Sequence, residues 1–160
     1  MTRDQMKRTK NQEGTLVSTA TVDRNEIASR PLNEEEEIYK ENILDHYKHP
    51  HNYGQLQEYT LAHREFNPLC GDDIIIYTLI QEGKIKDVSF QGKGCAISQA
   101  SISLLTDYLK RKPLAEVKKL TPETVMQLLG IPISLVRMKC ALLSLKAIHN
   151  GIKNMENTHE

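Results

Sequence analysis

The pattern of apolar and polar residues first indicates a helix over residues 34–48. Asn33 is a typical N-cap, and the acidic residues that follow it suit the positive end of a helix dipole. Apolar and aromatic side chains then recur at helical spacing until Pro50, which ends the helix. The folded domain is therefore predicted to begin near Asn33.

The pattern then becomes typical of strands. Residues 73–80 and 85–91 are rich in β-branched and aromatic side chains, and a short loop that contains Gly83 separates them. Residues 59–66 could supply a third strand. We therefore expect a small antiparallel sheet of three strands early in the domain.

After Gly94 the apolar spacing becomes helical. A stripe of apolar and small side chains runs through Ile97, Ala100, Ser101, Leu104, Leu105 and Tyr108. Shorter helices are predicted after Pro113 and Thr121, and a last helix from about residue 134 to about residue 154. Strands followed by helices predict an α+β fold, in which the three-stranded antiparallel sheet packs against about four to five helices.

Residues 1–33 differ from the rest of the chain. They contain no aromatic side chain and only scattered apolar ones, so they cannot bury enough apolar surface to offset the entropy lost on folding. We expect a disordered or loosely ordered extension over residues 1–33, a folded domain over residues 34–155 and a flexible C-terminus over residues 156–160. The acidic residues of the extension count against an organelle transit peptide, so a cytoplasmic location is favoured over import.

Composition and charge exclude several classes of protein. The 160-residue chain has 21 basic and 21 acidic residues, which argues against a nucleic-acid-binding protein whose affinity rests on phosphate neutralisation. No apolar run approaches the ~20 residues needed to span a bilayer. Three cysteines cannot all pair within the chain, so a disulfide framework is not expected. The three thiols therefore need another explanation.

All three cysteines fall outside the predicted core positions. Cys95 and Cys140 lie away from the apolar stripes of their helices, and Cys70 lies in the loop before the first long strand. A free cysteine is normally among the most buried residues, so three cysteines that avoid the core indicate a chemical role.

Positive groups adjoin two of the cysteines. Lys93 precedes Cys95 at a predicted helix start, and Arg137 and Lys139 precede Cys140. A helix N-terminus and basic neighbours stabilise a thiolate, so we expect a pKa below the ordinary cysteine value at both positions.

Asp72 adds a carboxylate two residues after Cys70. Residues i and i+2 of an extended segment point the same way, so both side chains could address one ion. Cys70, Asp72, Cys95 and Cys140 together would make a tetrahedral set suited to Zn²⁺ or to iron in a sulfur-rich site. The spacing alone also permits three unrelated cysteines, because the chain has no Cys-x-x-Cys pair.

The sequences around the cysteines resemble those of a known family. The three cysteine motifs of the iron–sulfur cluster assembly family, which comprises IscU, SufU and the N-terminal domain of NifU, are similar to NPLCGDD (67–73), GKGCAISQAS (92–101) and RMKCALLSLKAI (137–148). The family's N-terminal helix-and-turn signature is similar to ILDHYKHPHNYG (43–54). The Arg-x-Lys-Cys sequence at 137–140 is closest to the SufU branch, although the segment between Cys95 and Cys140 is shorter than in SufU proteins.

The resemblance implies a SufE/NifU-like fold with a metal site at one exposed end. Its ligands would be Cys70, Asp72, Cys95 and Cys140, and the site would hold Zn²⁺ or a transient [2Fe–2S] cluster. In SufU-like proteins such a site accepts a persulfide sulfur from a cysteine desulfurase, whereas in IscU-like proteins it assembles a cluster. The expected partners are a cysteine desulfurase and the downstream assembly machinery or acceptor apoproteins, with neither nucleic acid nor membrane.

The role of each residue depends on the branch. The sulfur acceptor would be Cys70 under the SufU interpretation and Cys140 under the scaffold interpretation, and Arg137 would orient the partner or the persulfide. The chain would be at most a zinc-dependent sulfurtransferase, and otherwise a scaffold without enzymatic activity.

Other interpretations compete with sulfur transfer. The site could be a structural zinc site that only stabilises the fold. A cysteine hydrolase would need a partner histidine, and neither His63 nor His149 has a motif context. The His-x-x-His-x-His run over residues 46–51 is interpreted as a helix end and turn, not as a set of ligands.

Overall fold

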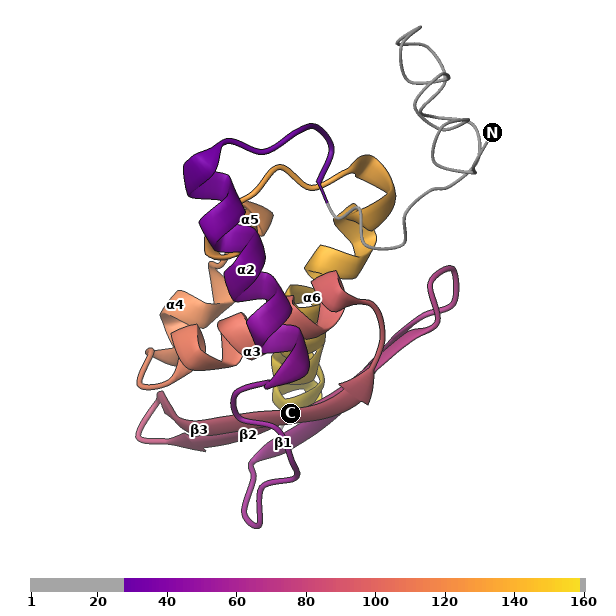
Figure 1. The fold of residues 1–160 in the computed structure, drawn as a ribbon. Helices are drawn as coiled ribbons and strands as arrows, with labels where there is room; N and C mark the ends of the chain where they lie inside the picture. The colour runs from indigo at the N-terminus through magenta and orange to yellow at the C-terminus, as the bar shows by residue number, and fades with distance from the viewer. Residues whose placement is uncertain (1–27, 159–160) are drawn as a thin grey trace, which may run out of the picture.

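The computed structural model describes residues 28–158 of the chain (Figure 1). Its elements are, in chain order, α2 (Glu34–Lys48), β1 (Leu61–Asn67), β2 (Asp72–Gln81), β3 (Lys84–Lys93), α3 (Ala96–Leu109), α4 (Leu114–Lys118), α5 (Pro122–Leu129) and α6 (Leu135–Thr158). The α+β fold with a three-stranded sheet is therefore confirmed.

The domain boundaries stay predictions, because most of the expected extension lies outside the described residues. The part that is described packs on the domain. Ala28 forms a β-bridge with Ile133, and the Ser29 N–H donates to the Pro132 carbonyl at 3.0 Å. At the other end of the chain, residues 156–158 continue helix α6.

The sheet has the order β1-β2-β3, with both pairs antiparallel. Asn67, at the end of β1, pairs with Asp72 at the start of β2, and Asp73 pairs with Lys93 at the end of β3. The turn between β1 and β2 therefore lies at the same end of the sheet as the last residues of β3. That end is the one from which the chain enters α3.

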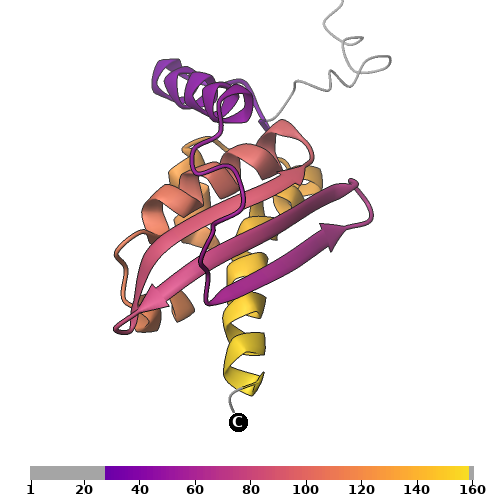
Figure 2. The ribbon, with the colours of Figure 1, turned by 90° about the horizontal axis from the view of Figure 1, so that it is seen from below.

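The helices cover one face of the sheet (Figure 2). Ile74 and Ile76 of β2 and Val88 and Phe90 of β3 are fully buried. Helix α6 packs on β1 and β2, and α3 packs on β3 and α6. In Figure 1, α2 passes in front of α3, and it packs on α3 and α5. Within the described residues, no helix is both long enough and apolar enough to cross a membrane.

Helix α3 is the most enclosed helix of the described part of the chain. Its predicted stripe is too narrow, because Leu104 and Tyr108 are only half-buried while Ser98, Ser103 and Thr106 are buried. The reason is that the sheet, α2, α5 and α6 surround α3, so little of its circumference remains for solvent. Its small polar side chains are therefore buried together with the apolar ones.

Candidate metal centre

The four predicted ligands come from three segments that meet at one end of the sheet. Cys70 lies in the β1–β2 turn, and Asp72 is the first residue of β2. Cys95 is the N-cap of α3, and Cys140 lies in the second turn of α6.

Short distances connect these side chains. The Cys140 Sγ lies 3.1 Å from the Cys70 Sγ, and ligand atoms of Cys70, Asp72 and Cys140 all lie within 4.8 Å of one another. Cys95 joins the group through Asp72, because its Sγ lies 3.9 Å from Oδ2 and its backbone N–H donates to Oδ1 at 2.9 Å. The structure thus brings Cys70, Asp72 and Cys140 into one group, and Cys95 lies outside this group but next to its Asp72.

The β1–β2 turn presents Cys70 to solvent. Gly71 has a φ of +71°, a left-handed conformation that favours glycine, and its N–H donates to the Asn67 carbonyl at 2.8 Å. The Asn67 Oδ1 accepts a second bond from the Leu69 N–H at 3.2 Å. These bonds close the turn, and the Cys70 side chain is exposed at its tip.

Asp72 is fully buried, and Gly94 makes the space for it. A Cβ at Gly94 would collide with the Asp72 carboxylate and with the Ser98 Oγ. A buried carboxylate is costly unless charge or hydrogen bonds compensate it, and the Cys95 N–H supplies one such bond. The remaining compensation would come from a cation, and a carboxylate beside thiols is a donor set that fits Zn²⁺ or iron.

Cys95 has the role of a helix N-cap, which Ser, Thr, Asn or Asp usually fills. Its Sγ accepts the Ser98 N–H at 3.5 Å, and the Ser98 Oγ donates to the Cys95 carbonyl at 3.1 Å. The side chain is half-buried. The helix start therefore fixes the sulfur beside the Asp72 carboxylate.

The prediction that Cys140 avoids the core is wrong, because its side chain is 0% exposed. The buried face of α6 is wider than one apolar stripe, since the helix packs on both the sheet and α3, and it also includes Ala141 and Ser144. The prediction of a lowered pKa is also wrong for Cys140. Burial, and then hydrogen bonds with Cys70 and Asp72, raise its pKa well above the ordinary value.

The basic neighbours do not reverse this effect. Lys139 is exposed, and Arg137 is half-buried in the first turn of α6. The backbone N–H of Arg137 donates to the Ser134 carbonyl at 3.0 Å. Lys139 is thus next to Cys140 along the chain, but its side chain is in solvent while the Cys140 sulfur is buried.

The histidines considered for a hydrolase have other partners. The His149 Nε2 lies 2.9 Å from the Val117 carbonyl oxygen, and the His63 Nε2 lies 3.5 Å from the Glu65 Oε2. Neither of these contacts, both within the described residues, pairs a histidine with a cysteine thiol. The structure therefore gives no support to a cysteine–histidine pair.

Sequence reasoning did not find a groove of about 400 Å³ beside the β1–β2 turn. Its lining residues come from that turn and from α6: Phe66, Asn67, Pro68, Leu69, Lys139, Leu142, Leu143 and Lys146. Phe66 is 52% exposed and Leu69 is 77% exposed, so apolar surface is open next to Cys70. The only signal in the sequence was that two apolar residues, Phe66 and Leu69, lie just before and within the NPLCGDD motif.

Comparison with known proteins places the chain in a family. Residues 38–160 match the NifU-like N-terminal domain family. The Archaeoglobus fulgidus iron–sulfur cluster assembly scaffold protein IscU 1 is 31% identical over 115 residues, which cover 72% of this chain and 74% of the relative. The Bacillus subtilis zinc-dependent sulfurtransferase SufU is 32% identical over 136 residues, which cover 74% of this chain and 92% of the relative.

A solved structure agrees with both matches. The crystal structure of an iron–sulfur cluster assembly scaffold protein for the SUF system from Fervidobacterium islandicum is 30% identical, with a TM-score of 0.59. The similarity covers 72% of this chain and 97% of that structure. Sequence and fold therefore point the same way, and the chain belongs to the NifU-like N-terminal domain family, together with the IscU- and SufU-type iron–sulfur cluster assembly proteins.

Proposed function

We propose that the chain binds a metal ion, or the iron of a growing cluster, through Cys70, Asp72, Cys95 and Cys140, and accepts sulfur there from a cysteine desulfurase persulfide. The observation that carries this proposal is the group formed by Cys70, Asp72 and Cys140 at one end of the sheet, with the Cys95 sulfur 3.9 Å from the Asp72 carboxylate. A bound Zn²⁺ would keep its coordinating thiols deprotonated.

The exposure of the three thiols favours Cys70 as the sulfur acceptor. A persulfide carried by another protein must reach the acceptor from outside, and Cys70 is exposed whereas Cys140 is buried. The Cys70 thiolate attacks the outer sulfur of the persulfide, the S–S bond of the desulfurase breaks, and its cysteine leaves as a thiolate. Cys70 then carries the persulfide.

The surroundings of Cys70 suit the docking of a partner protein. The groove beside the turn combines the exposed Phe66 and Leu69 with the amino groups of Lys139 and Lys146. We assign the cysteine desulfurase to this surface, and Arg137 to orienting the partner or its persulfide. Downstream assembly proteins or acceptor apoproteins would then receive the sulfur or the cluster. The cytoplasmic location of the chain stays a prediction.

Transfer of labelled sulfur tests this proposal. A cysteine desulfurase charged with ³⁵S-persulfide is mixed with the wild-type chain or with Cys70→Ala, and protein-bound label is measured over time without reductant. We expect the label on the wild type and little on Cys70→Ala, with Lys153→Ala as a control variant on the exposed far part of α6. Labelling of Cys70→Ala at the wild-type rate would exclude Cys70 as the acceptor.

A second candidate function is cluster assembly without sulfur transfer. The SufU alignment is 136 positions long but takes in only 74% of this 160-residue chain, so that relative has residues which this chain lacks. The match to Archaeoglobus IscU needs no such extra residues, because its 115 positions take in 72% of the chain. The alignment with the Streptococcus pyogenes scaffold protein IscU, 137 positions over 75% of this chain, also contains residues that this chain lacks, so the Archaeoglobus match is the observation that favours the scaffold branch.

Metal analysis separates the candidates. Protein purified without oxygen would be colourless and would contain Zn bound at the cysteine centre if it transfers sulfur, whereas cluster-type absorption after reconstitution with iron and sulfide would favour the scaffold. The structural zinc site, the third alternative, predicts unfolding on chelation and no stimulation of a desulfurase.

A further inference from the structure

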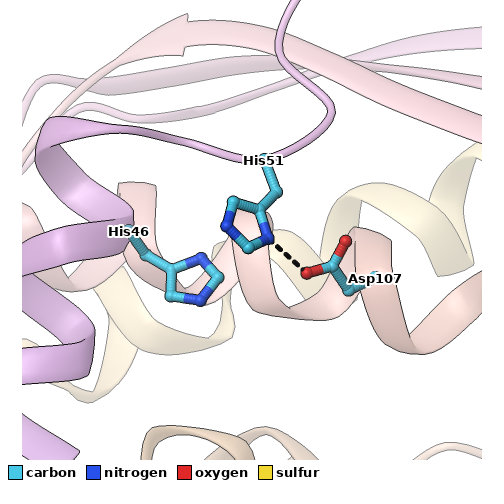
Figure 3. Close-up of side chains that lie close together, drawn as sticks. All are labelled: His46, His51 and Asp107. Carbon is cyan, nitrogen blue, oxygen red and sulfur yellow. Dashed lines mark hydrogen bonds and ion pairs between the residues drawn. The ribbon is translucent and has the colours of Figure 1, made fainter.

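A second group of metal-ligand side chains lies between helices α2 and α3. His46 in the last turn of α2, His51 in the turn that follows and Asp107 near the end of α3 each offer one ligand atom, and these atoms lie within 4.8 Å of one another. In Figure 3 the His51 ring lies between the His46 ring and the Asp107 carboxylate. The histidine run interpreted as a helix end and turn thus also forms a cluster with an acid from another helix.

This cluster is separate from the cysteine centre. Asp107 follows Cys95, the N-cap of α3, by twelve residues, which is about 18 Å along a helix axis. The two groups therefore lie toward opposite ends of α3, and they cannot share one ion.

Neighbouring polar groups hold the three side chains in place. The Ser103 Oγ lies 2.7 Å from the His46 Nδ1 and accepts the His51 backbone N–H at 2.8 Å. The His51 Nδ1 lies 2.6 Å from the Asp107 Oδ2. Metal-ligating histidines usually have an oxygen partner on one ring nitrogen, and for His46 the Ser103 hydroxyl on Nδ1 leaves Nε2 for the ion.

Asn52 fixes the carboxylate. Its Nδ2 donates to the Asp107 Oδ1 at 2.8 Å and to the Thr106 Oγ1 at 3.0 Å. Its backbone has a φ of +55°, which asparagine tolerates better than most residues. The turn is thereby held in the conformation that places His51 against α3.

The donor chemistry selects a class of ion. Two imidazoles and a carboxylate suit Zn²⁺ and similar divalent transition metals, and this set has no sulfur for a soft ion or a cluster. His46 is only 5% exposed, whereas His51 and Asp107 are exposed, so an ion would enter from solvent and reach the buried ring last.

We propose that His46, His51 and Asp107 form a second metal site, for a divalent transition-metal ion such as Zn²⁺, which connects the end of α2 to α3. A tetrahedral ion with bonds of about 2.0–2.2 Å needs its ligand atoms roughly 3.4 Å apart. The ligand atoms already lie within 4.8 Å of one another, and rotation of the exposed His51 and Asp107 side chains would bring them to that spacing. The ion takes the place of the hydrogen bond between His51 and Asp107.

Zn²⁺ stoichiometry tests the second site. The full chain is stripped of metal under reducing, oxygen-free conditions and titrated with Zn²⁺ in a calorimeter, as the wild type, His51→Ala and His49→Ala. His49 belongs to the same histidine run and is exposed, but it lies outside the cluster, so it is the matched control. We expect His51→Ala to bind one equivalent of Zn²⁺ fewer than either the wild type or His49→Ala.

The comparison is independent of the cysteine centre, because that centre is the same in all three proteins. Equal stoichiometry in His51→Ala and His49→Ala would overturn the proposal. Asp107→Asn keeps the shape of the side chain and decides the matter if His51→Ala does not fold. We expect Asp107→Asn to weaken binding of the second equivalent by at least the roughly 10–100-fold that is typical for loss of an outer-shell partner, whereas an unchanged affinity would overturn the carboxylate's part in the site.

Discussion

At the scale of single residues, the contact between Asp72 and Gly94 determines the geometry of the cysteine centre. The carboxylate is buried, accepts the Cys95 N–H and lies beside the thiols, and it fits because Gly94 has no side chain. The i, i+2 argument could predict Asp72 as a ligand from local sequence alone. It could not predict the need for Gly94, because this contact joins two segments that only the sheet brings together.

Replacing Gly94 with alanine should therefore weaken metal binding. The added Cβ would push the Asp72 carboxylate or the Ser98 hydroxyl from its position, and overpacking of this kind costs about 1–3 kcal/mol of stability. Competition with a chromophoric chelator would measure Zn²⁺ affinity, and urea unfolding would measure stability. Gly83→Ala, at a φ of +73° with open space around it, is the control that strains the backbone but leaves metal affinity unchanged. Equal metal affinity in the two variants would contradict this role for Gly94.

The buried Cys140 shows where local patterns stop being informative. Its position relative to one apolar stripe predicted exposure, and its basic neighbours predicted a low pKa. Both predictions failed because the packing partners of α6 determine how wide its buried face is, and the helix turns Lys139 outward. Burial and side-chain direction are properties of the assembled fold, and neighbours in sequence do not specify them.

At the scale of elements, α3 is the helix that connects the rest. Its N-cap belongs to the cysteine centre, its far end belongs to the histidine cluster, and its middle is hydrogen-bonded to α6. The Ser101 Oγ donates to the Ala141 carbonyl at 2.6 Å and lies 2.8 Å from the Ser144 Oγ. The helical period predicted this element, but it did not predict that polar side chains would lie on its buried sides, because their partners belong to other helices.

The serine pair between α3 and α6 gives a prediction about coupling. Ser101→Ala should lower the free energy of unfolding by about 1–3 kcal/mol, since it leaves the buried Ser144 hydroxyl without this partner. The double variant Ser101→Ala/Ser144→Ala removes both hydroxyls and should cost less than the sum of the two single changes. Urea unfolding of the four proteins measures the coupling, and strictly additive costs would show that the two hydroxyls act independently.

The start of α2 gives a prediction about pH. Arg30 donates to both carboxylate oxygens of Glu36 at 2.9 and 2.7 Å, and this contact, followed by the Asn33 N–H, holds the pKa of Glu36 below its ordinary value of 4.5. Because the folded-state pKa is depressed, the stabilisation is complete above about pH 4.5 and is lost as the pH falls through the folded-state value.

Glu36→Gln should therefore melt below the wild type at neutral pH, with a difference in Tm that shrinks as the pH falls below about 4.5. Melting followed by circular dichroism between pH 7 and pH 3 would measure it. Glu34→Gln, in the same helical turn but outside the capping box, is the control. A Tm difference that is constant over this range would contradict the assignment.

At the scale of the whole molecule, the proposed cysteine centre joins the sheet to two helices. The alternating pattern of the strands and the order of strands before helices were enough to predict the α+β fold, and the family motifs predicted the four candidate ligands. The sequence could not predict the distances between these ligands, such as the 3.1 Å between the Cys70 and Cys140 sulfurs. That distance depends on how α6 crosses the sheet, which is set by long-range packing.

Metal binding should therefore stabilise the entire domain. An ion that binds only the folded state adds about 2.7 kcal/mol to the free energy of unfolding when its free concentration is 100 times its Kd. We expect Zn²⁺ to raise the Tm of His51→Ala, in which the second site is absent, and to raise it much less when Cys70→Ala is added. Scanning calorimetry with and without a chelator measures this gain. The same gain with and without Cys70 would remove that thiol from the set of ligands.

The order of the proposed ligands along the chain has a consequence for biosynthesis. Cys70, Asp72 and Cys95 leave the ribosome before Cys140, and translation at about 5–20 residues per second separates the appearance of the last two by several seconds. During that interval the nascent chain offers only part of the centre, and its buried sulfur is still missing. A complete cage for the ion can close only when α6 folds onto the sheet, so loading of the centre is a late event that reports a finished domain.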